Sequence, residues 1–437
     1  MTTGLRTRRE FLRGTALGGA LASTVPAFLA QTWRALGAEA LEGATAPVTG
    51  KDGRILVVLQ LAGGNDGLNT VVPFADDHYR KARPRLAIPA GEVLRIDDHL
   101  GFHPALKALQ ALRQEGRMSL IQGVGYPNPN RSHFRSMEIW QTGRDSDRFE
   151  REGWIGRYFD HACAGADPTV GVSLGNQMPQ AFNARTPKGI SVGIPGRGGG
   201  ARRGGGSSEE GHGGAGKDAG GDMMPGGSGD SVDALSGPSV ARGAVLDFLD
   251  RTALDAEVSS AKVREITTRV RNQAEYPAHR LAQSLKRVAQ LIAGGLSTRV
   301  YYVSQGGFDT HTNQAANHAR LLGEFGDSMK AFVEDLRAQG NLSRVLVMTF
   351  SEFGRRVAEN ASGGTDHGAA GPMFLFGSGF RAPVVGESPD LAPGSLVQGD
   401  PRFSLDFRRV YATVLDQWLE TSSEKVLGRK FDPVAVL

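Results

Sequence analysis

Short, continuously apolar runs alternate with segments of helical periodicity along most of this 437-residue chain. The runs have the length and composition of buried β-strands, and they lie at residues 54–61, 118–124, 298–304, 344–350 and 373–376. The helical segments lie at residues 104–114, 132–141, 241–293 with a break near Pro277, 317–338 and 407–420. This alternation predicts an α/β fold in which a parallel-rich central sheet is covered by helices on both faces.

One long segment, residues 196–237, departs from this pattern. It is rich in glycine and has almost no large apolar residues and no periodicity. Such a segment cannot bury enough apolar surface to offset the entropy lost on ordering, so we expect a disordered surface insertion. A phosphate-binding glycine loop is disfavoured because no strand leads into the segment and no helix directly follows it. The rest of residues 41–437 is predicted to form a single α/β domain.

The N-terminus holds the arginine pair Arg8-Arg9 in the segment TRREFLR, followed by an Ala- and Gly-rich run at residues 14–30. This order predicts a twin-arginine signal peptide over residues 1–40, with Ala38-Glu39-Ala40 as the cleavage site. The alternative is a chance arginine pair in a basic, disordered N-terminus. Residues 14–30 are too short and too weakly apolar to favour a membrane span. We therefore expect a periplasmic or secreted protein that meets the twin-arginine translocase and has no stable membrane span after cleavage.

Charge and cysteine content exclude several classes of function. The formal net charge is +4, part of it belongs to the signal peptide, and the charges are interspersed. No basic stripe indicates a nucleic-acid partner. The single cysteine, Cys163, excludes an internal disulfide and a cysteine-based zinc site. It agrees with folding in a reducing cytoplasm before export.

Polar clusters follow the predicted strands, at the points where the strands end. The clusters are Gly63–Asn69, Asn130–Phe134, Gly306–His311, Ser351–Arg355 and Gly364–Gly368. Because the carboxyl ends of parallel strands meet at one edge of a sheet, we expect these clusters to form one site. Each cluster alone has an ordinary structural explanation: a turn, a helix N-cap at Ser132, or an ion pair between Glu352 and Arg355. Their recurrence after successive strands favours the shared site.

The side chains in these clusters are those that bind divalent cations. Asp, Glu and His ligands without Cys suit Zn²⁺, Mn²⁺ or a similar ion, and the inventory suffices for one or two ions. His133 and His318 are further candidates. The predicted metal ligands are Asp66, Asp309, His311, Glu352, Asp366 and His367.

These motifs resemble the "domain of unknown function 1501" family of twin-arginine-exported proteins, over nearly the whole mature chain except the insertion. The motifs that carry the resemblance are Gly63–Asn69 with Thr70–Pro73 behind it, Arg131–Phe134, Gly307–His311, Ser351–Arg355 and Asp366–Gly368. That family is in turn similar to the alkaline phosphatase and sulfatase superfamily, whose members place a nucleophile beside one or two divalent metals. The resemblance implies that Ser132 is the nucleophile and that Arg131 and Arg355 stabilise the oxygens of the reacting group.

The resemblance implies an exported, metal-dependent hydrolase that acts on phosphate or sulfate esters of a small-molecule or polymer substrate. Two positions depart from the superfamily pattern. The superfamily's metal-binding aspartate follows the first strand, where this chain has Gln60, and Asp66 lies six residues further on. Phe353 stands where the superfamily usually has a histidine. A later histidine, His367, could supply the missing imidazole. Two alternatives therefore stay open: a non-catalytic binding module on the same fold, and a metal-dependent carboxylic esterase or lactonase.

Overall fold

The computed structural model describes residues 53–186, 188–193 and 258–437, which belong to one compact unit, Thr49–Leu437. The predicted signal peptide and the predicted disordered insertion at 196–237 lie outside the described residues, so both stay predictions, as does the division into domains. In the described ranges no helix combines the length and the apolar character needed to cross a membrane.

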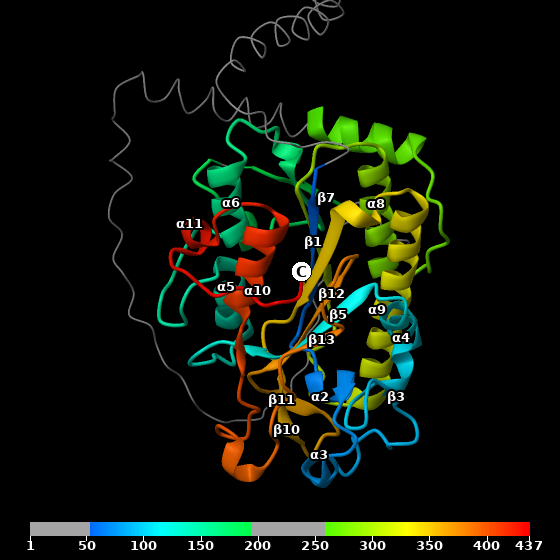
Figure 1. Cartoon of the computed structure of the whole chain (residues 1–437), viewed down its shortest axis with the longest axis vertical. Coiled ribbons are helices and arrows are strands. Elements are labelled where there is room, and N and C mark those ends of the chain that lie inside the picture. The colour runs from blue at the N-terminus through cyan, green and yellow to red at the C-terminus, as the bar shows by residue number, and fades with distance from the viewer. Residues whose placement is uncertain (1–52, 187, 194–257) are drawn as a thin grey trace, which may run out of the picture. The chain divides into compact units, whose positions relative to one another are not determined.

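The centre of the fold is a mixed, mostly parallel sheet (Figure 1). Its strands follow the order β13-β5-β12-β9-β1-β8-β6-β7, and β14 pairs with β5. Their bounds are β1 Ile55–Leu61, β5 Met118–Gly125, β6 Gly171–Leu174, β7 Ile190–Val192, β8 Val300–Gln305, β9 Val345–Phe350, β12 Gly371–Phe376, β13 Val384–Val385 and β14 Leu405–Asp406. All pairs are parallel except those of β12, which runs antiparallel to β5 and to β9.

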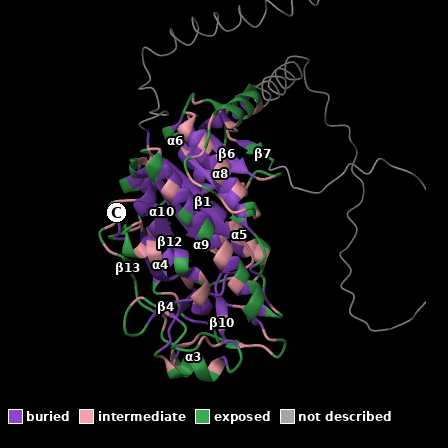
Figure 2. Ribbon diagram, turned by 90° about the vertical axis from the view of Figure 1, so that its right-hand side faces the viewer, coloured by how far each residue is buried: buried purple, intermediate pink, exposed green. Residues whose placement is uncertain are grey.

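Helices cover both faces of this sheet, which confirms the predicted fold class. Alternate side chains of β1 enter different cores: Val57 and Leu59 pack on one face, Leu56 and Val58 on the other. The first face is covered by α4 (Lys107–Gln114), α8 (Arg280–Ala293) and α9 (Gln314–Ala338). The second is covered by α5 (His133–Thr142), α6 (Trp154–Ala162), α10 (Phe407–Thr413) and α11 (Ser423–Leu427). Both faces bury apolar side chains, and the central strands β1 and β9 are buried throughout (Figure 2).

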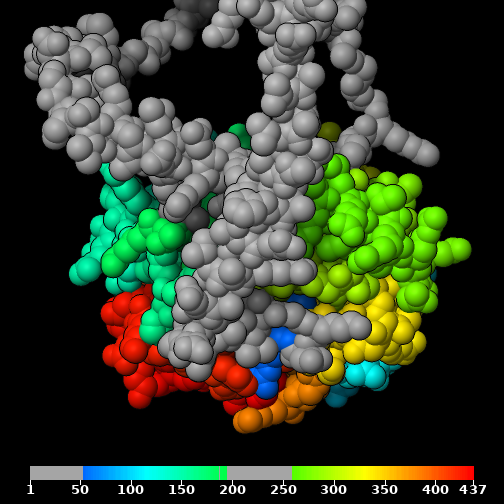
Figure 3. Space-filling view, turned by 90° about the horizontal axis from the view of Figure 1, so that it is seen from above, coloured from blue at the N-terminus to red at the C-terminus, as the bar shows by residue number. Residues whose placement is uncertain are grey.

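Seen from above (Figure 3), the red C-terminal segment and the green-to-yellow segment lie on different sides of the visible surface. The long predicted helix at 241–293 is interrupted as expected near Pro277: residues 258–269 are helical and α8 begins at Arg280, while 241–257 lie outside the described ranges. The predicted closing helix is α10 followed by a π-helical turn, Val414–Trp418. The sequence pattern missed α6, β6 and β7; the two strands are four and three residues long.

Small elements cap the edge at which β1, β8 and β9 end. A hairpin of β10 (Arg355–Glu359) and β11 (Thr365–His367) lies there beside α2 (Gly67–Thr70) and α3 (Asp77–Ala82) (Figure 1). A three-stranded sheet of β2 (Val71–Val72), β3 (Leu94–Arg95) and β4 (Gly101–Phe102) adjoins α2 in the chain. Three of the nine predicted site residues, Arg355, Asp366 and His367, lie in the hairpin.

Candidate metal centre

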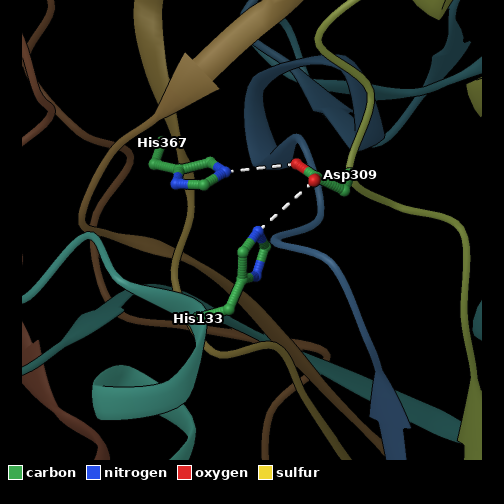
Figure 4. Close-up of side chains that lie close together, drawn as sticks. All are labelled: His133, Asp309 and His367. Carbon is green, nitrogen blue, oxygen red and sulfur yellow. Dashed lines mark hydrogen bonds and ion pairs between the residues drawn. The ribbon is translucent and has the colours of Figure 1, made fainter. Parts of the chain in front are cut away.

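Four side chains from three separate segments converge at this edge. Asp309 and His311 follow β8, His133 is the first residue of α5, and His367 ends β11. Asp309 is central: its Oδ1 lies 3.1 Å from Nε2 of His367 and 3.1 Å from Nε2 of His311. Its Oδ2 lies 3.4 Å from Nε2 of His133 (Figure 4). The Nε2 atoms of His311 and His367 are 2.9 Å apart.

Each of these imidazoles uses its other nitrogen, Nδ1, for a hydrogen bond to an oxygen. The three pairs are His133 with Glu352 Oε1 at 3.0 Å, His311 with Asp366 Oδ1 at 3.1 Å, and His367 with the Arg131 carbonyl at 2.8 Å. Carbonyl and carboxylate oxygens accept hydrogen bonds, so we assign the proton of each neutral ring to Nδ1. Each Nε2 then presents a lone pair to the Asp309 carboxylate. Metal-binding histidines are oriented in this way.

The charges of the cluster also favour a cation. Burial acts to raise the pKa of Asp309, but the hydrogen bond and the positive charge of Arg355 outweigh it and lower that pKa to about 2. Burial lowers the pKa of His367, against its bonds to Asp309 and to the Arg131 carbonyl. At neutral pH the ionised Asp309 carboxylate thus faces the neutral imidazole of His367. His133 Nε2 is buried and, among the residues that the structure describes, has no hydrogen-bond partner, although Asp309 Oδ2 lies 3.4 Å away.

A divalent cation fits this donor set. Three imidazole nitrogens and one carboxylate are ligands that zinc and similar ions accept. Ligand atoms of His133, Asp309 and His367 all lie within 4.8 Å of one another. His311 joins them through its short distances to Asp309 and His367. We call Asp309, His133, His311 and His367 the open cluster, because the Asp309 side chain is 47% exposed.

Two predicted ligands, Glu352 and Asp366, lie behind the imidazoles. Glu352 is buried, and its Oε1 accepts from the Gly63 amide at 2.7 Å as well as from His133. Asp366 accepts from His311 and from Asn360. Their contacts orient histidines, because a carboxylate beside an Nδ1–H accepts its hydrogen bond. Their predicted role as metal ligands stays a prediction.

The predicted oxygen-binding arginines are both paired with carboxylates. Arg355 is buried, and its Nη2 donates to Asp309 Oδ1 at 2.7 Å while other donors reach the carbonyls of Gly64 and Thr365. Arg131 donates to Asp400 Oδ2 through Nε at 3.0 Å and Nη2 at 2.6 Å. Arg355 therefore fixes Asp309. The role predicted for both arginines, to stabilise the oxygens of the reacting group, stays a prediction.

The Gly-Gly turn after β1 packs against this site. Gly63 has φ +119°, and a Cβ there would lie 2.3 Å from the Asp309 amide nitrogen. Gly64 has φ +76°, and a Cβ there would lie 2.2 Å from the Phe353 ring. Only glycine allows both the positive φ and the close approach. Phe353, which replaces the expected histidine, packs its ring 4.9 Å from that of His133 and 4.5 Å from that of His367.

Asp66, another predicted ligand, lies in a different environment. It is fully buried, and its Oδ2 accepts from Arg83 Nη1 at 2.6 Å and from Gln314. Burial acts to raise its pKa, and Arg83 more than offsets that, so its pKa is lowered. Its Oδ1 accepts from the Asn69 amide as the N-cap of α2. Arg83, seventeen residues further along the chain, thus occupies the Asp66 carboxylate. None of these hydrogen bonds connects Asp66 to the open cluster.

His318, the further candidate imidazole, lies near Asp66. Its Nε2 is hydrogen-bonded to Asn65 Oδ1 at 2.9 Å, and burial lowers its pKa to about 4. We call Asp66, Arg83, Gln314, Asn65 and His318 the closed cluster. The Asp66 carboxylate and the Asn65 side-chain oxygen already have protein donors.

Ser132 is exposed at the N-cap position of α5, directly before His133, and its side chain makes no capping hydrogen bond. The sequence-based prediction of an N-cap is thus correct for its backbone position, while its hydroxyl is free to face solvent. His133 was only a further candidate in the sequence, although it belongs to the same cluster as Ser132. The helix N-terminus at this point favours a bound anion.

Comparison with solved structures finds distant similarity. The chain is similar to the C-terminal periplasmic domain of EcEptC from Escherichia coli in its complex with Zn, with 10% identity, TM-score 0.35, and 75% of this chain and 74% of that chain covered. It is also similar to the phosphonate monoester hydrolase SpPMH from Silicibacter pomeroyi, with 8% identity, TM-score 0.36, and 87% and 78% covered. For the alkaline phosphatase from the Antarctic bacterium TAB5 the values are 10%, 0.30, 75% and 92%.

Similarity at this level leaves the function to be inferred from the site itself. No curated protein matches the chain. Residues 246–427 match the family model described as "Protein of unknown function (DUF1501)", and the family resemblance predicted from the strand-end motifs is thereby confirmed.

Proposed function

We propose that this protein is an exported hydrolase of phosphate or sulfate esters, with one divalent cation held by the open cluster and Ser132 as nucleophile. The observation that carries the proposal is the orientation of the three imidazoles. Each keeps its proton on Nδ1 and aims Nε2 at the Asp309 carboxylate, so three imidazole lone pairs face a carboxylate to which Arg355 donates. A divalent cation bound there supplies positive charge that lowers the pKa of a nearby hydroxyl and attracts anionic esters.

The residues of the chain supply the remaining parts of the reaction. The Ser132 oxygen forms a bond to phosphorus or sulfur, its proton passes to solvent, and the ester oxygen leaves with its electron pair and takes a proton from water. Water then hydrolyses the seryl ester. The N-terminus of α5 stabilises the anionic group beside Ser132. Arg355 keeps Asp309 ionised and fixed.

A second candidate is a metal-dependent carboxylic esterase or lactonase. The specific observation in its favour is that Arg131 and Arg355 are both paired with carboxylates. A phosphoryl or sulfuryl group presents several charged oxygens, whereas a carboxylic ester develops charge on one oxygen only, which needs fewer cationic partners.

The decisive experiment compares Ser132→Ala with Ser362→Ala, an exposed serine in the β10–β11 turn. Each purified variant is assayed for metal content and against aryl phosphate mono- and diesters, an aryl sulfate and an aryl carboxylate. We expect Ser132→Ala to lose at least about 1,000-fold in activity toward phosphate or sulfate esters and to keep its metal. Ser362→Ala should resemble the wild type.

Other outcomes select the alternatives. Full activity of Ser132→Ala, confined to the carboxylate ester, would favour the lactonase-type reaction. A wild-type protein without metal and without activity would favour the non-catalytic binding module. Export by the twin-arginine translocase is a further part of the proposal, and Arg8-Arg9→Lys-Lys should leave the precursor in the cytoplasm, because the receptor recognises the guanidinium pair.

A further inference from the structure

A buried carboxylate outside the open cluster, Asp400, is linked to one of its histidines through a single residue. Asp400 is 2% exposed and lies shortly before β14. Its Oδ2 accepts two hydrogen bonds from the Arg131 guanidinium, from Nε at 3.0 Å and from Nη2 at 2.6 Å. The carbonyl of the same Arg131 accepts the Nδ1–H of His367 at 2.8 Å. The side chain and the backbone of Arg131 thus connect Asp400 to a proposed metal ligand.

The position of Asp400 is itself fixed on two sides. Its backbone pairs with Val397 in a tight turn, and the neighbouring Gly399 carbonyl accepts from the Val357 amide in β10. Its second oxygen, Oδ1, lies 3.8 Å from Nε of Arg356. The loop before β14 and the β10–β11 hairpin therefore hold the carboxylate in place. A rigid carboxylate can hold the Arg131 segment against His367.

We propose that Asp400 is a positioning residue of the cation site, which fixes the Arg131 carbonyl and through it the proton position and orientation of His367. The inference rests on the proposed function, because it assigns to His367 the role of a ligand. Groups that orient metal-binding histidines raise metal affinity about 10- to 100-fold. Asp400 acts one step further out, so the effect of its removal should lie at the lower end of that range.

A purely structural role predicts a different result. The Arg131 side chain is 32% exposed, so it can turn to water when Asp400 is neutralised. Neutralising Asp400 then mainly removes the restraint on the Arg131 carbonyl, and the stability of the fold decreases less. A buried ion pair that only stabilised the fold would lower the melting temperature and leave the affinity for metal in the folded protein unchanged.

The test uses Asp400→Asn in the full chain, with Glu359→Gln as the matched control. Glu359 lies in β10, its side chain is 6% exposed, and it pairs with Arg85, which is not among the partners of the three histidines. Zn²⁺ affinity is measured by competition with a chelator. We expect Asp400→Asn to bind Zn²⁺ about 10-fold more weakly and Glu359→Gln to bind it as the wild type does. Arg131→Met should give the same loss, and the double variant should lose no more than either single one.

A second readout needs no metal. In the chelated protein with ¹⁵N-labelled histidine, NMR should report the Nδ1–H form of His367 in the wild type and a mixture of forms in Asp400→Asn. Wild-type Zn²⁺ affinity together with an unchanged His367 proton position in Asp400→Asn would overturn the inference. So would equal losses of affinity in Asp400→Asn and Glu359→Gln. If the wild type binds no Zn²⁺, the proposed function fails, and the NMR comparison still decides the role of Asp400.

Discussion

The open and closed clusters are each centred on an aspartate that follows a strand, and they differ in the groups that surround its carboxylate. Asp309 and Asp66 each follow a buried parallel strand, β8 and β1, which are neighbours in the sheet. Each has a buried guanidinium at hydrogen-bond distance, Arg355 at 2.7 Å and Arg83 at 2.6 Å. Around Asp66, donors of the protein occupy the carboxylate; around Asp309, three imidazoles present lone pairs as well.

This difference separates a structural site from a candidate catalytic one. An acidic residue at a strand end is equally consistent with either. What distinguishes them is the balance of donors and acceptors: Asp66 is matched by Arg83, Gln314 and the Asn69 amide, whereas the open cluster has more acceptors than donors. A surplus of acceptors is stable only with a cation or with added protons.

The largest effect expected from this comparison concerns Asp309. Asp309→Asn removes the only charged ligand of the open cluster, so we expect Zn²⁺ affinity to fall at least about 1,000-fold, beyond the 10- to 100-fold typical of orienting groups. Metal content by elemental analysis and affinity by chelator competition measure it. An Asp309→Asn protein that retained wild-type affinity would show that the cation, if bound, lies elsewhere.

In the closed cluster the corresponding change should affect stability instead. Asp66→Ala leaves the Arg83 guanidinium buried and unpaired, and we expect the free energy of unfolding to fall by about 3–5 kcal/mol. Metal content should stay at one ion per chain. Urea unfolding measures the loss, and the double variant Asp66→Ala, Arg83→Met should recover part of it. Loss of metal in a folded Asp66→Ala protein would instead show that Asp66 contributes to the metal site and that the two clusters act together.

The sequence predicted the sheet well because its strands carry their own local pattern. The observed bounds of β1, β8 and β9 lie within two residues of the apolar runs at 54–61, 298–304 and 344–350. The antiparallel direction of β12 could not be predicted, since strand direction depends on the connections and not on residue pattern.

The site was only partly predictable for a similar reason. Asp309 and His311 lie shortly after β8, and His367 lies at the end of β11, so their convergence could be expected. The role of Asp66 depends on Arg83, at the end of α3, and the setting of Arg131 depends on Asp400, 269 residues away. Such partners are fixed by the tertiary fold, and the local sequence around Asp66 or Arg131 holds no trace of them.

The pH dependence of stability offers a third, smaller contrast. His318 has a pKa of about 4 in the fold and an ordinary value of 6.5, so the unfolded chain binds a proton between these values that the fold does not. Stability should therefore fall as pH decreases from about 6.5 to about 4, by up to about 3 kcal/mol from this group. The pKa of Asp309 is depressed to about 2, so its contribution is complete above 3.8 and is lost only as pH falls through about 2.

Urea unfolding of the chelated protein at pH 7 and pH 4.5 measures this effect, with His318→Gln as the variant. Glutamine does not titrate in this range and can still donate a hydrogen bond to Asn65. The difference between the two pH values should shrink in His318→Gln. An equal difference in both proteins would assign the pH dependence to other groups, such as His367, whose pKa burial also lowers.

The smallest expected effect concerns Phe134, which follows His133 in α5 and is 91% exposed. A large apolar side chain held in water one residue from a proposed ligand gives a substrate an apolar surface to contact. Covering roughly 40 Å² of such a ring is worth about 1 kcal/mol, or about five-fold in affinity. Phe134→Ala should therefore raise KM about two- to five-fold for an aryl ester, leave kcat unchanged, and leave KM for the methyl ester of the same acid unchanged.

Phe149→Ala is the matched control, because Phe149 is also exposed, at 80%, but lies under the Arg135 guanidinium, 3.9 Å from its ring centre. A contact with the substrate beside the open cluster predicts an effect of Phe134 alone. Equal changes of KM in both variants would mean that the aryl group binds any exposed aromatic ring, with no preference for the one beside the open cluster. A change in kcat with Phe134→Ala would mean instead that the ring supports the position of His133, since kcat responds to the geometry of the reacting groups and KM to contacts made equally in the ground and transition states.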